Sequence, residues 1–326
     1  ATTTVPNIPL NAQWTQNAVT VIGAHDQGSA LNQLNSPRGL LIVYDDDDDS
    51  TIVIADIGNY RIMKWILGNV DGEVVAGGKG QGHRLDQLGA ETHVLIDKKT
   101  DSYIICDLKN RRVLRWSRRK GTKEGETLID NISCLGMAMD SEGRLYVSDI
   151  DNREVRRYET GDKIGTLVAG GHGAGYDLNQ ILSPYFIFVD QQQNLYVADN
   201  GNHRVMKWGK DAKEGIAVAG GHGIGNSLSQ LRYPNGIFVD TMGTVYVADD
   251  LNHRVMRWAQ GAKQGTVIVG GNDRGQGANQ LNGVTGLFFD RRGNLYVGDR
   301  NNNRVQRFSL QGRSDCSYAC PCVMWL

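Results

Sequence analysis

Val197-Ala-Asp-Asn-Gly-Asn-His-Arg-Val-Met-Lys-Trp208 is the stretch that decides the fold, because the chain repeats it six times. The other five copies run over residues 54–65, 105–116, 147–158, 247–258 and 297–308. Their shared asparagine falls at positions 59, 110, 152, 202, 252 and 302, which gives spacings of 51, 42, 50, 50 and 50 residues. A period near 50 residues, filled with short β-prone runs and glycine turns, is typical of β-propeller blades.

Each repeat divides into four short strands. In the fourth copy these are expected at residues 186–190, 195–198, 204–208 and 216–219, with polar or glycine-containing turns between them. No stretch of useful length has the periodicity of an amphipathic helix. The sequence therefore predicts an all-β, six-bladed propeller with four-stranded blades.

The two ends of the repeat array complement each other. The sixth copy stops after its third strand, whereas Ala18-Val-Thr-Val-Ile-Gly23 matches the fourth strands of other copies. We expect this N-terminal strand to complete the last blade, because pairing it there removes an open sheet edge. The predicted organisation is an extended segment at 1–17, the propeller at 18–311 and a cysteine-rich tail at 312–326.

The motif Asp-x-x-Asn-x-Arg, followed by an apolar residue, resembles the NHL repeat over about residues 18–311. This resemblance implies a six-bladed propeller, in agreement with the number of copies. The third copy departs from the motif, because Glu154 stands where the other copies have arginine.

Three polar positions recur in these copies, and each has a structural interpretation. The aspartates end the second strands and can accept backbone N–H bonds, the asparagines suit tight turns, and the arginines can bind carboxylates or turn carbonyls. Regular repetition around a ring favours this interpretation over a ring of ligand-binding arginines. The residues are Asp56, Asn59, Arg61, Asp107, Asn110, Arg112, Asp149, Asn152, Asp199, Asn202, Arg204, Asp249, Asn252, Arg254, Asp299, Asn302 and Arg304.

Five histidines are the candidate ligand or metal residues. His203 and His253 lie in turns between second and third strands, and His25, His172 and His222 lie in blade-to-blade loops. In an antiparallel blade both kinds of connection open on the same face, where imidazoles can bind a divalent metal. The favoured alternative is a structural or solvated role, since repeat copying by itself duplicates histidines. We expect no cofactor on that alternative, and zinc or calcium otherwise.

The charge pattern excludes some classes of partner. Lys plus Arg number 35 and Asp plus Glu number 36, so a basic face for nucleic acid is not expected. The acidic run at 45–49 lacks the spaced ligands of a calcium loop and indicates a solvated hairpin tip. No apolar run is long enough to span a membrane.

The cysteines and a glycosylation sequon indicate the cellular location of the protein. Cys106 and Cys134 lie in apolar strand-like runs, which indicates buried thiols. The sequon at Asn131 is a glycosylation candidate and favours a secreted protein. The three cysteines of the tail are disulfide candidates and favour the same location. They are Cys316, Cys320 and Cys322.

These observations favour a binding or assembly module over an enzyme. The first hypothesis is a secreted propeller that binds a protein or carbohydrate ligand and can form homo-oligomers or filaments through its terminal segments. The resemblance supplies an alternative, since similar propellers include a zinc-dependent amidating lyase and lactonases. In that case the histidine-bearing rim would carry a metal-dependent lyase or hydrolase site, although the sequence assigns no catalytic residues.

Overall fold

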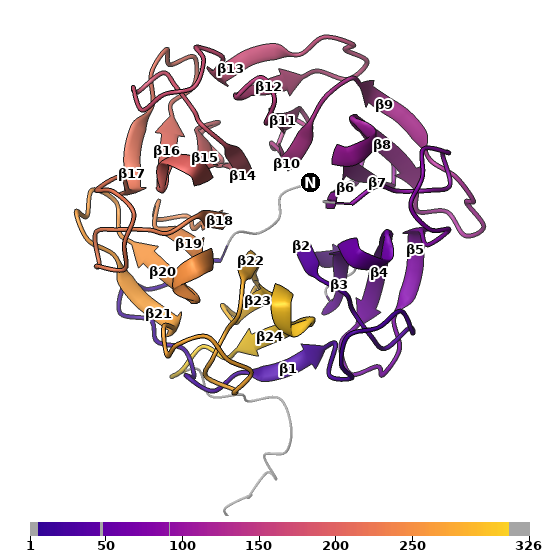
Figure 1. The fold of residues 1–326 in the computed structure, drawn as a ribbon, viewed down its shortest axis with the longest axis horizontal. Coiled ribbons are helices and arrows are strands. Elements are labelled where there is room, and N and C mark those ends of the chain that lie inside the picture. Colours follow the sequence, from indigo (N-terminus) through magenta and orange to yellow (C-terminus); the bar gives the residue numbers. More distant parts are fainter. Residues whose placement is uncertain (1–5, 46–47, 91, 313–326) are drawn as a thin grey trace, which may run out of the picture.

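A computed structural model describes residues 6–45, 48–90 and 92–312. Six four-stranded antiparallel sheets stand around a common axis, which confirms the predicted all-β, six-bladed propeller (Figure 1). Among the described residues, helical structure is limited to five short 3-10 turns. No described helix has the length and apolar character needed to cross a membrane.

Each blade runs from an innermost strand at the axis to an outermost strand at the rim. The innermost strands are β2 (Pro37–Asp45), β6 (Thr92–Asp97), β10 (Cys134–Met139), β14 (Pro184–Val189), β18 (Pro234–Val239) and β22 (Val284–Phe289). The second strands are β3 (Asp48–Asp56), β7 (Ser102–Asp107), β11 (Leu145–Asp149), β15 (Leu195–Asp199), β19 (Val245–Asp249) and β23 (Leu295–Asp299).

The third strand of each blade begins with the motif arginine or, in blade 3, with Glu154. The third strands are β4 (Arg61–Ile66), β8 (Arg112–Ser117), β12 (Glu154–Tyr158), β16 (Arg204–Trp208), β20 (Arg254–Trp258) and β24 (Arg304–Phe308). The outermost strands of blades 1 to 5 are β5 (Glu73–Gly77), β9 (Glu126–Asp130), β13 (Thr166–Gly170), β17 (Ile216–Gly220) and β21 (Thr266–Gly270). The 3-10 turns are η1 (Ile57–Asn59), η2 (Leu108–Asn110), η3 (Asn200–Asn202), η4 (Asp250–Asn252) and η5 (Arg300–Asn302).

The ring closes through the N-terminal strand. Strand β1 (Val19–Ile22) pairs antiparallel with β24, so the sheet order of blade 6 is β1-β24-β23-β22. The predicted closure is therefore confirmed. The segment before β1 also packs on the propeller, because Ile8 and Trp14 are both buried and the Trp14 indole donates to the Gly293 carbonyl at 2.8 Å. The N-terminal lead-in thus adds apolar contacts to the closed ring.

Apolar residues form a cluster at each interface between neighbouring sheets. Strand alternation places one set of side chains on each face of a blade, and the next blade covers that set. The aromatic residues that end the third strands are all buried in these interfaces, as packing rather than ligand stacking requires. They are Trp65, Trp116, Tyr158, Trp208, Trp258 and Phe308.

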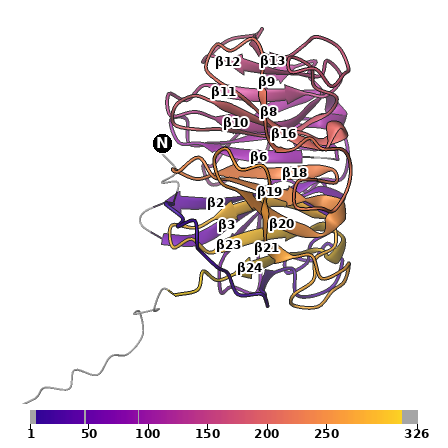
Figure 2. The same ribbon diagram turned by 90° about the vertical axis from the view of Figure 1, so that its left-hand side faces the viewer.

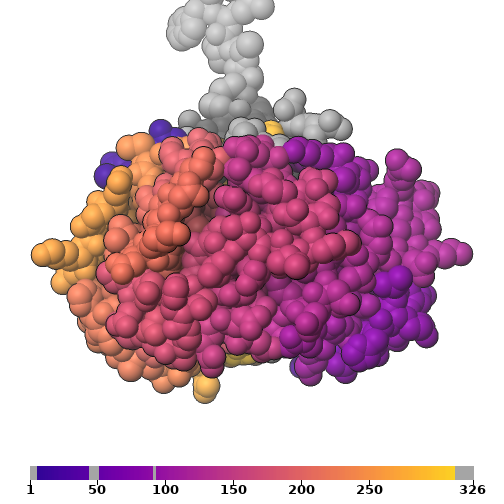
Figure 3. All heavy atoms as spheres, turned by 90° about the horizontal axis from the view of Figure 1, so that it is seen from above, coloured from indigo at the N-terminus to yellow at the C-terminus, as the bar shows by residue number. Residues whose placement is uncertain are grey.

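The disc has two faces, which Figure 2 shows edge-on and Figure 3 shows from the rim. The loop face carries the 3-10 turns and the blade-to-blade loops. The hairpin face carries the turns between first and second strands and the connections between third and fourth strands. The acidic hairpin of blade 1 joins β2 to β3 on the hairpin face, and residues 46–47 at its tip lie outside the described residues.

Candidate functional site

The repeat arginines act as clamps on the loops of the loop face. In blade 4, Arg204 Nε lies 3.0 Å from Asp199 Oδ2, and its two terminal nitrogens donate to the carbonyls of Tyr176, Asp177 and Gln180. Asn202 donates to the same carboxylate and to the Gly175 carbonyl. The same bonds recur at Arg61, Arg112, Arg254 and Arg304. In this arrangement all three guanidinium nitrogens of the blade 4 clamp have protein acceptors.

Blade 3 lacks both the arginine of this clamp and the long loop that the arginine binds in other blades. The connection from β9 to β10 spans only residues 131–133, so there is no long loop whose carbonyls an arginine could bind. Glu154 takes the arginine position and pairs instead with Arg156 Nε at 2.5 Å. The short spacing and the missing arginine therefore have one physical cause.

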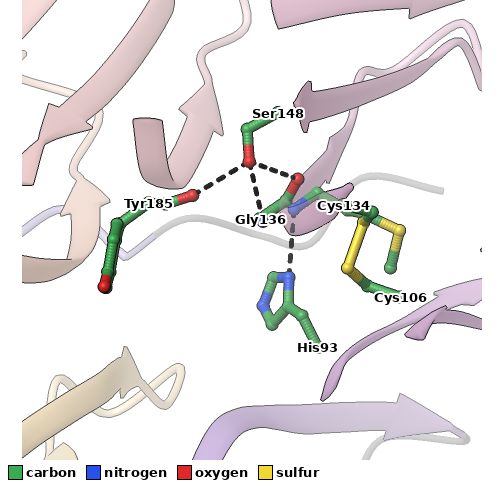
Figure 4. Close-up of a disulfide and its surroundings, with 7 residues drawn as sticks. His93, Cys106, Cys134, Gly136, Ser148 and Tyr185 are labelled. Carbon is green, nitrogen blue, oxygen red and sulfur yellow. Dashed lines mark hydrogen bonds between the residues drawn. A yellow bond between two sulfur atoms is a disulfide. The ribbon is translucent and has the colours of Figure 1, made fainter. Parts of the chain in front are cut away.

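A disulfide joins the blades at this short connection. Cys106 of β7 and Cys134 of β10 are bonded, with their Cα atoms 5.6 Å apart, and both residues are fully enclosed (Figure 4). The prediction of two buried thiols was correct about burial and wrong about the thiols. Sequence gave no pairing signal because 28 residues separate the two cysteines, and only the packing of blade 2 on blade 3 brings them together. Cys316, Cys320 and Cys322 lie outside the described residues.

The five predicted histidines are distributed around the loop face, one to a loop or turn. His25, His172 and His222 each use the backbone carbonyl to accept a bond from a loop glutamine, which leaves the imidazole outside that contact. His203 and His253 accept backbone N–H groups of the next blade at 3.3 and 3.4 Å through Nδ1. Among the described residues, no three His, Cys, Asp or Glu side chains come close enough to hold a metal ion. The histidine rim does not fit a metal centre.

The structure instead contains a cavity on the propeller axis, with a volume of about 240 Å³. Its walls are the six innermost strands. Its lining continues to the turns between first and second strands on the hairpin face, where it includes Lys99 and Gln192. Equivalent positions on the six blades form an asymmetric layer halfway along it. Blades 4 to 6 present phenyl rings and blades 1 to 3 present smaller aliphatic side chains. These residues are Leu41, Leu95, Ala138, Phe188, Phe238 and Phe288.

The three phenyl rings form a continuous aromatic wall. The centroid of the Phe238 ring lies 5.6 Å from that of Phe188 and 5.6 Å from that of Phe288. These separations are in the range of favourable aromatic pairs. The equivalent positions of the opposite wall carry Leu41, Leu95 and Ala138, which are smaller than phenylalanine.

Two contacts across the axis close the cavity toward the loop face. The His93 ring of blade 2 meets the Phe186 ring of blade 4, with centroids 4.8 Å apart, although blade 3 lies between these two blades. Arg38 of blade 1 lies over the ring of Tyr185 in blade 4, 5.1 Å from its centroid. His93 lines the cavity. We call the His93–Phe186 pair the floor.

His93 lines the cavity and was not among the site residues predicted from the sequence. Its Nδ1 accepts the Met137 N–H at 3.1 Å (Figure 4), and the residue is buried. Burial, helped by the nearby Arg38 guanidinium, lowers the pKa of His93 to about 4. The imidazole is therefore neutral at physiological pH.

A signal for the floor was present in the repeats. In four innermost strands a glycine precedes the first wall residue, at positions 39, 136, 236 and 286. These glycines permit close blade contacts, since a Cβ on Gly136 would lie 2.1 Å from the Tyr185 carbonyl oxygen. Phe186 takes the glycine position in blade 4, and blade 2 has the single residue His93 where other blades have two. Both departures from the repeat thus meet at the floor.

A buried polar group lies toward the loop face beyond the floor. Asn235 donates to Asp250 Oδ2 at 3.0 Å, and both residues are more than nine-tenths buried. Burial raises the pKa of the Asp250 carboxyl, while Arg300 and Arg38 oppose that shift. The guanidinium groups of Arg300 and Arg38 offset the carboxylates of Asp250 and the neighbouring Asp249, so the cluster has no excess negative charge for a divalent cation. This cluster therefore does not fit a metal site either.

Comparisons with known proteins agree with the fold. The model of the SMP-30/gluconolactonase/LRE-like region matches residues 90–325. No curated protein matches the chain in sequence. The NHL repeat family is not shown by these comparisons, and that resemblance stays a prediction.

Solved structures share the propeller at low sequence identity. An auxiliary nutrient binding protein from Bacteroides thetaiotaomicron is 15% identical with a TM-score of 0.70, over 92% of this chain and 78% of that one. A putative gluconolactonase is 16% identical with a TM-score of 0.61, over 93% and 94% of the two chains. A streptogramin B lyase is 10% identical with a TM-score of 0.57, over 90% and 97%. At these identities the likeness concerns the fold, whereas the family match covers most of the sequence, and the chain belongs to the SMP-30/gluconolactonase/LRE-like family.

Proposed function

We propose that this protein is a secreted binding propeller that receives a small, largely apolar molecule in its axial cavity. The observation that supports this proposal is the cavity itself, which has apolar residues along the innermost strands, extends to the turns of the hairpin face and is bounded on the other side by the His93–Phe186 contact. An apolar cavity of about 150 Å³ is already enough to hold benzene. A single substituted ring would therefore fit the axial volume of about 240 Å³.

Two observations support binding rather than metal-dependent chemistry. Among the described residues no three His, Cys, Asp or Glu side chains come close enough to hold a metal ion. At the cavity mouth, the carboxylates of Asp140, Asp190 and Asp240 accept backbone N–H groups of the turns that they begin. A similar fold occurs in the Bacteroides nutrient binding protein, which gives binding a precedent on this scaffold.

The secreted location is supported by the disulfide. Disulfides persist in oxidising compartments and are rare in the reducing cytosol. Intact mass measurement before and after reduction would test the bond and would also report glycan on Asn131. An unreduced mass equal to that of the free-thiol chain would contradict this part of the proposal.

Binding can be tested with acetophenone as the probe. Ala138→Phe should reduce the cavity volume, because Ala138 lines the cavity and three equivalent positions already carry phenylalanine. Ala217→Phe on exposed strand β17 makes the same change at the rim and serves as the matched control. We expect millimolar or tighter binding to wild type and to the control, and binding about tenfold weaker or absent in Ala138→Phe. Equal binding by all three proteins would contradict an axial site.

The second candidate function is hydrolysis or lyase chemistry, which family membership favours. It predicts turnover of a lactone and stoichiometric zinc or calcium in the purified protein. Elemental analysis together with an assay on gluconolactone would detect both. Metal-free protein that binds acetophenone but leaves the lactone intact would exclude this candidate.

Assembly is the remaining part of the sequence hypothesis. Association through the terminal segments predicts a concentration-dependent mass in sedimentation, lost on removal of residues 313–326. A constant monomer mass at high concentration would exclude it.

A further inference from the structure

The floor of the axial cavity offers one hydrogen-bond donor whose identity the structure defines. The Met137 N–H donates to His93 Nδ1 at 3.1 Å, so Nδ1 acts as an acceptor and carries no proton. A neutral imidazole has one proton, which must then sit on Nε2. The backbone of blade 3 thus fixes the tautomer of a side chain on blade 2.

Within the part of the chain that the structure describes, the Nε2–H group has no hydrogen-bond partner. Across residues 6–45, 48–90 and 92–312, the Met137 bond is the hydrogen bond that His93 makes. His93 belongs to the cavity lining, and Nε2 is the ring nitrogen farther from the backbone. We infer that its N–H faces the space at the floor. A donor in such a space is satisfied only by water or by a ligand oxygen.

The rest of the deep site is apolar. The layer directly above the floor consists of Leu40, Val94, Met137, Ile187, Ile237 and Leu287. A charged ligand group would lose its hydration in this layer, because none of its six side chains carries a charge and the nearest cation, Arg38, lies beyond the floor. A neutral ring would gain contact with the aromatic wall of blades 4 to 6. The site therefore combines one directed polar bond with nonpolar contacts on the remaining sides.

We propose that the axial site selects small, neutral, mainly aromatic molecules that carry a carbonyl-type oxygen, and that His93 Nε2–H binds this oxygen at the floor. The proposal rests on the proposed function, because it names the ligand class of the same cavity. His93 is a binding residue in this scheme, and Phe186 holds its ring from the opposite side of the axis. Specificity arises because a hydrocarbon of the same shape leaves the donor unsatisfied.

The experiment compares acetophenone with α-methylstyrene, in which a CH₂ group replaces the carbonyl oxygen. Dissociation constants are measured by calorimetry or NMR for wild type and for His93→Asn. Asparagine keeps an acceptor for the Met137 N–H, but its amide ends one bond short of the position of Nε2. We expect the preference for acetophenone over α-methylstyrene to fall by about five- to tenfold in the variant, the size of one net hydrogen bond.

Each outcome separates this inference from the function on which it rests. If both probes bind and their ratio is the same in the two proteins, the role of His93 is wrong and the axial site remains. If neither probe binds wild type, the proposed function fails, and the ligand class fails with it.

A second readout does not depend on the variant. In ¹⁵N-labelled wild type, the His93 imidazole should show one protonated nitrogen, Nε2, whose signal moves with acetophenone and moves less with α-methylstyrene. A proton on Nδ1, or an Nε2 signal unaffected by acetophenone, would overturn the assignment even if His93→Asn failed to fold.

Discussion

At the residue scale, the same buried arginine–aspartate ion pair stabilises five of the six blades. A buried ion pair is costly to break by removing one partner, because the other charge stays behind without compensation. Arg204 is 2% exposed and Asp199 is fully buried. The clamp also binds three loop carbonyls, so its loss affects both the blade and the loop before it.

We predict that Arg204→Met lowers the free energy of unfolding by about 3–5 kcal/mol, as for other broken buried pairs. Urea denaturation at pH 7 measures the change. The matched control is Glu154→Gln, which alters the same repeat position in the blade without a clamp. It should cost less than about 1 kcal/mol, because the Arg156 side chain is 31% exposed and the amide oxygen of glutamine can still accept from Arg156, although Glu154 itself is buried. Equal costs would show that the clamp contributes no more than this half-exposed pair.

The second residue prediction concerns pH and His93. Its pKa lies near 4 in the folded protein, below the value of about 6.5 expected in the unfolded chain. Between these two values the unfolded state binds more protons, so stability is present above pH 6.5 and is lost as the pH falls toward 4. The loss should reach about 3 kcal/mol at most.

The comparison with His93→Asn isolates this effect. Burial lowers the pKa of His203 and His253 and raises that of Asp56, Asp249 and Asp299, but these groups occur in both proteins. The difference in unfolding free energy between pH 7 and pH 4.5 should therefore be smaller in the variant. A difference equal to that of wild type would mean that His93 does not titrate as its burial requires.

At the scale of elements, the junction between blades 2 and 3 is held by a different device from the other junctions. Its short connection, residues 131–133, lacks the loop that an arginine clamps elsewhere. In its place Ser133 Oγ donates to Asp151 at 2.5 Å, Arg111 pairs with the same carboxylate, and the disulfide joins β7 to β10.

We predict that Cys106→Ala/Cys134→Ala lowers the free energy of unfolding by about 2–4 kcal/mol, the usual contribution of a disulfide. The measurement is urea denaturation without reductant. The control is wild type that has been denatured and refolded in the presence of reductant. Its free energy of unfolding should approach that of the double variant. If wild type unfolded without reductant has two more reactive thiols per chain than the double variant, the bond does not form, since the other three cysteines are common to both proteins.

At the scale of the whole molecule, ring closure depends on residues at opposite ends of the chain. Strand β1 supplies the outermost strand of blade 6, and its Ile22 is buried. Ile8 and Trp14 of the preceding segment pack into the core cluster of blades 5 and 6. Propeller closure by such a strand removes a free edge and couples the first blade to the last.

Deletion of residues 1–22 should therefore lower the melting temperature by about 10 °C or more, given the burial of three large apolar side chains. Val19→Thr is the control, because Val19 is 55% exposed and its replacement leaves the strand pairing intact. The measurement is a thermal melt followed by circular dichroism. An unchanged melting temperature in the deletion would contradict closure through β1.

The sequence by itself determined the fold, because each repeat carries a complete blade. The spacing of the asparagines fixed the number of blades, and the unmatched run at 18–23 fixed the closure. Those features are local or periodic, so they are visible in one dimension. The same copying placed several histidines on one face of the ring, which favoured the prediction of a metal site. Their positions in separate loops and turns keep the imidazoles apart.

Only the tertiary structure decided which departures from the repeat act together. His93 and Phe186 are 93 residues apart in the chain, and Cys106 and Cys134 are in different blades. Each pair forms because closing the ring brings innermost strands within contact distance across the axis, or places one sheet directly on the next. No period in the sequence encodes those distances, since they follow from the curvature of the closed ring and from side-chain packing at its axis.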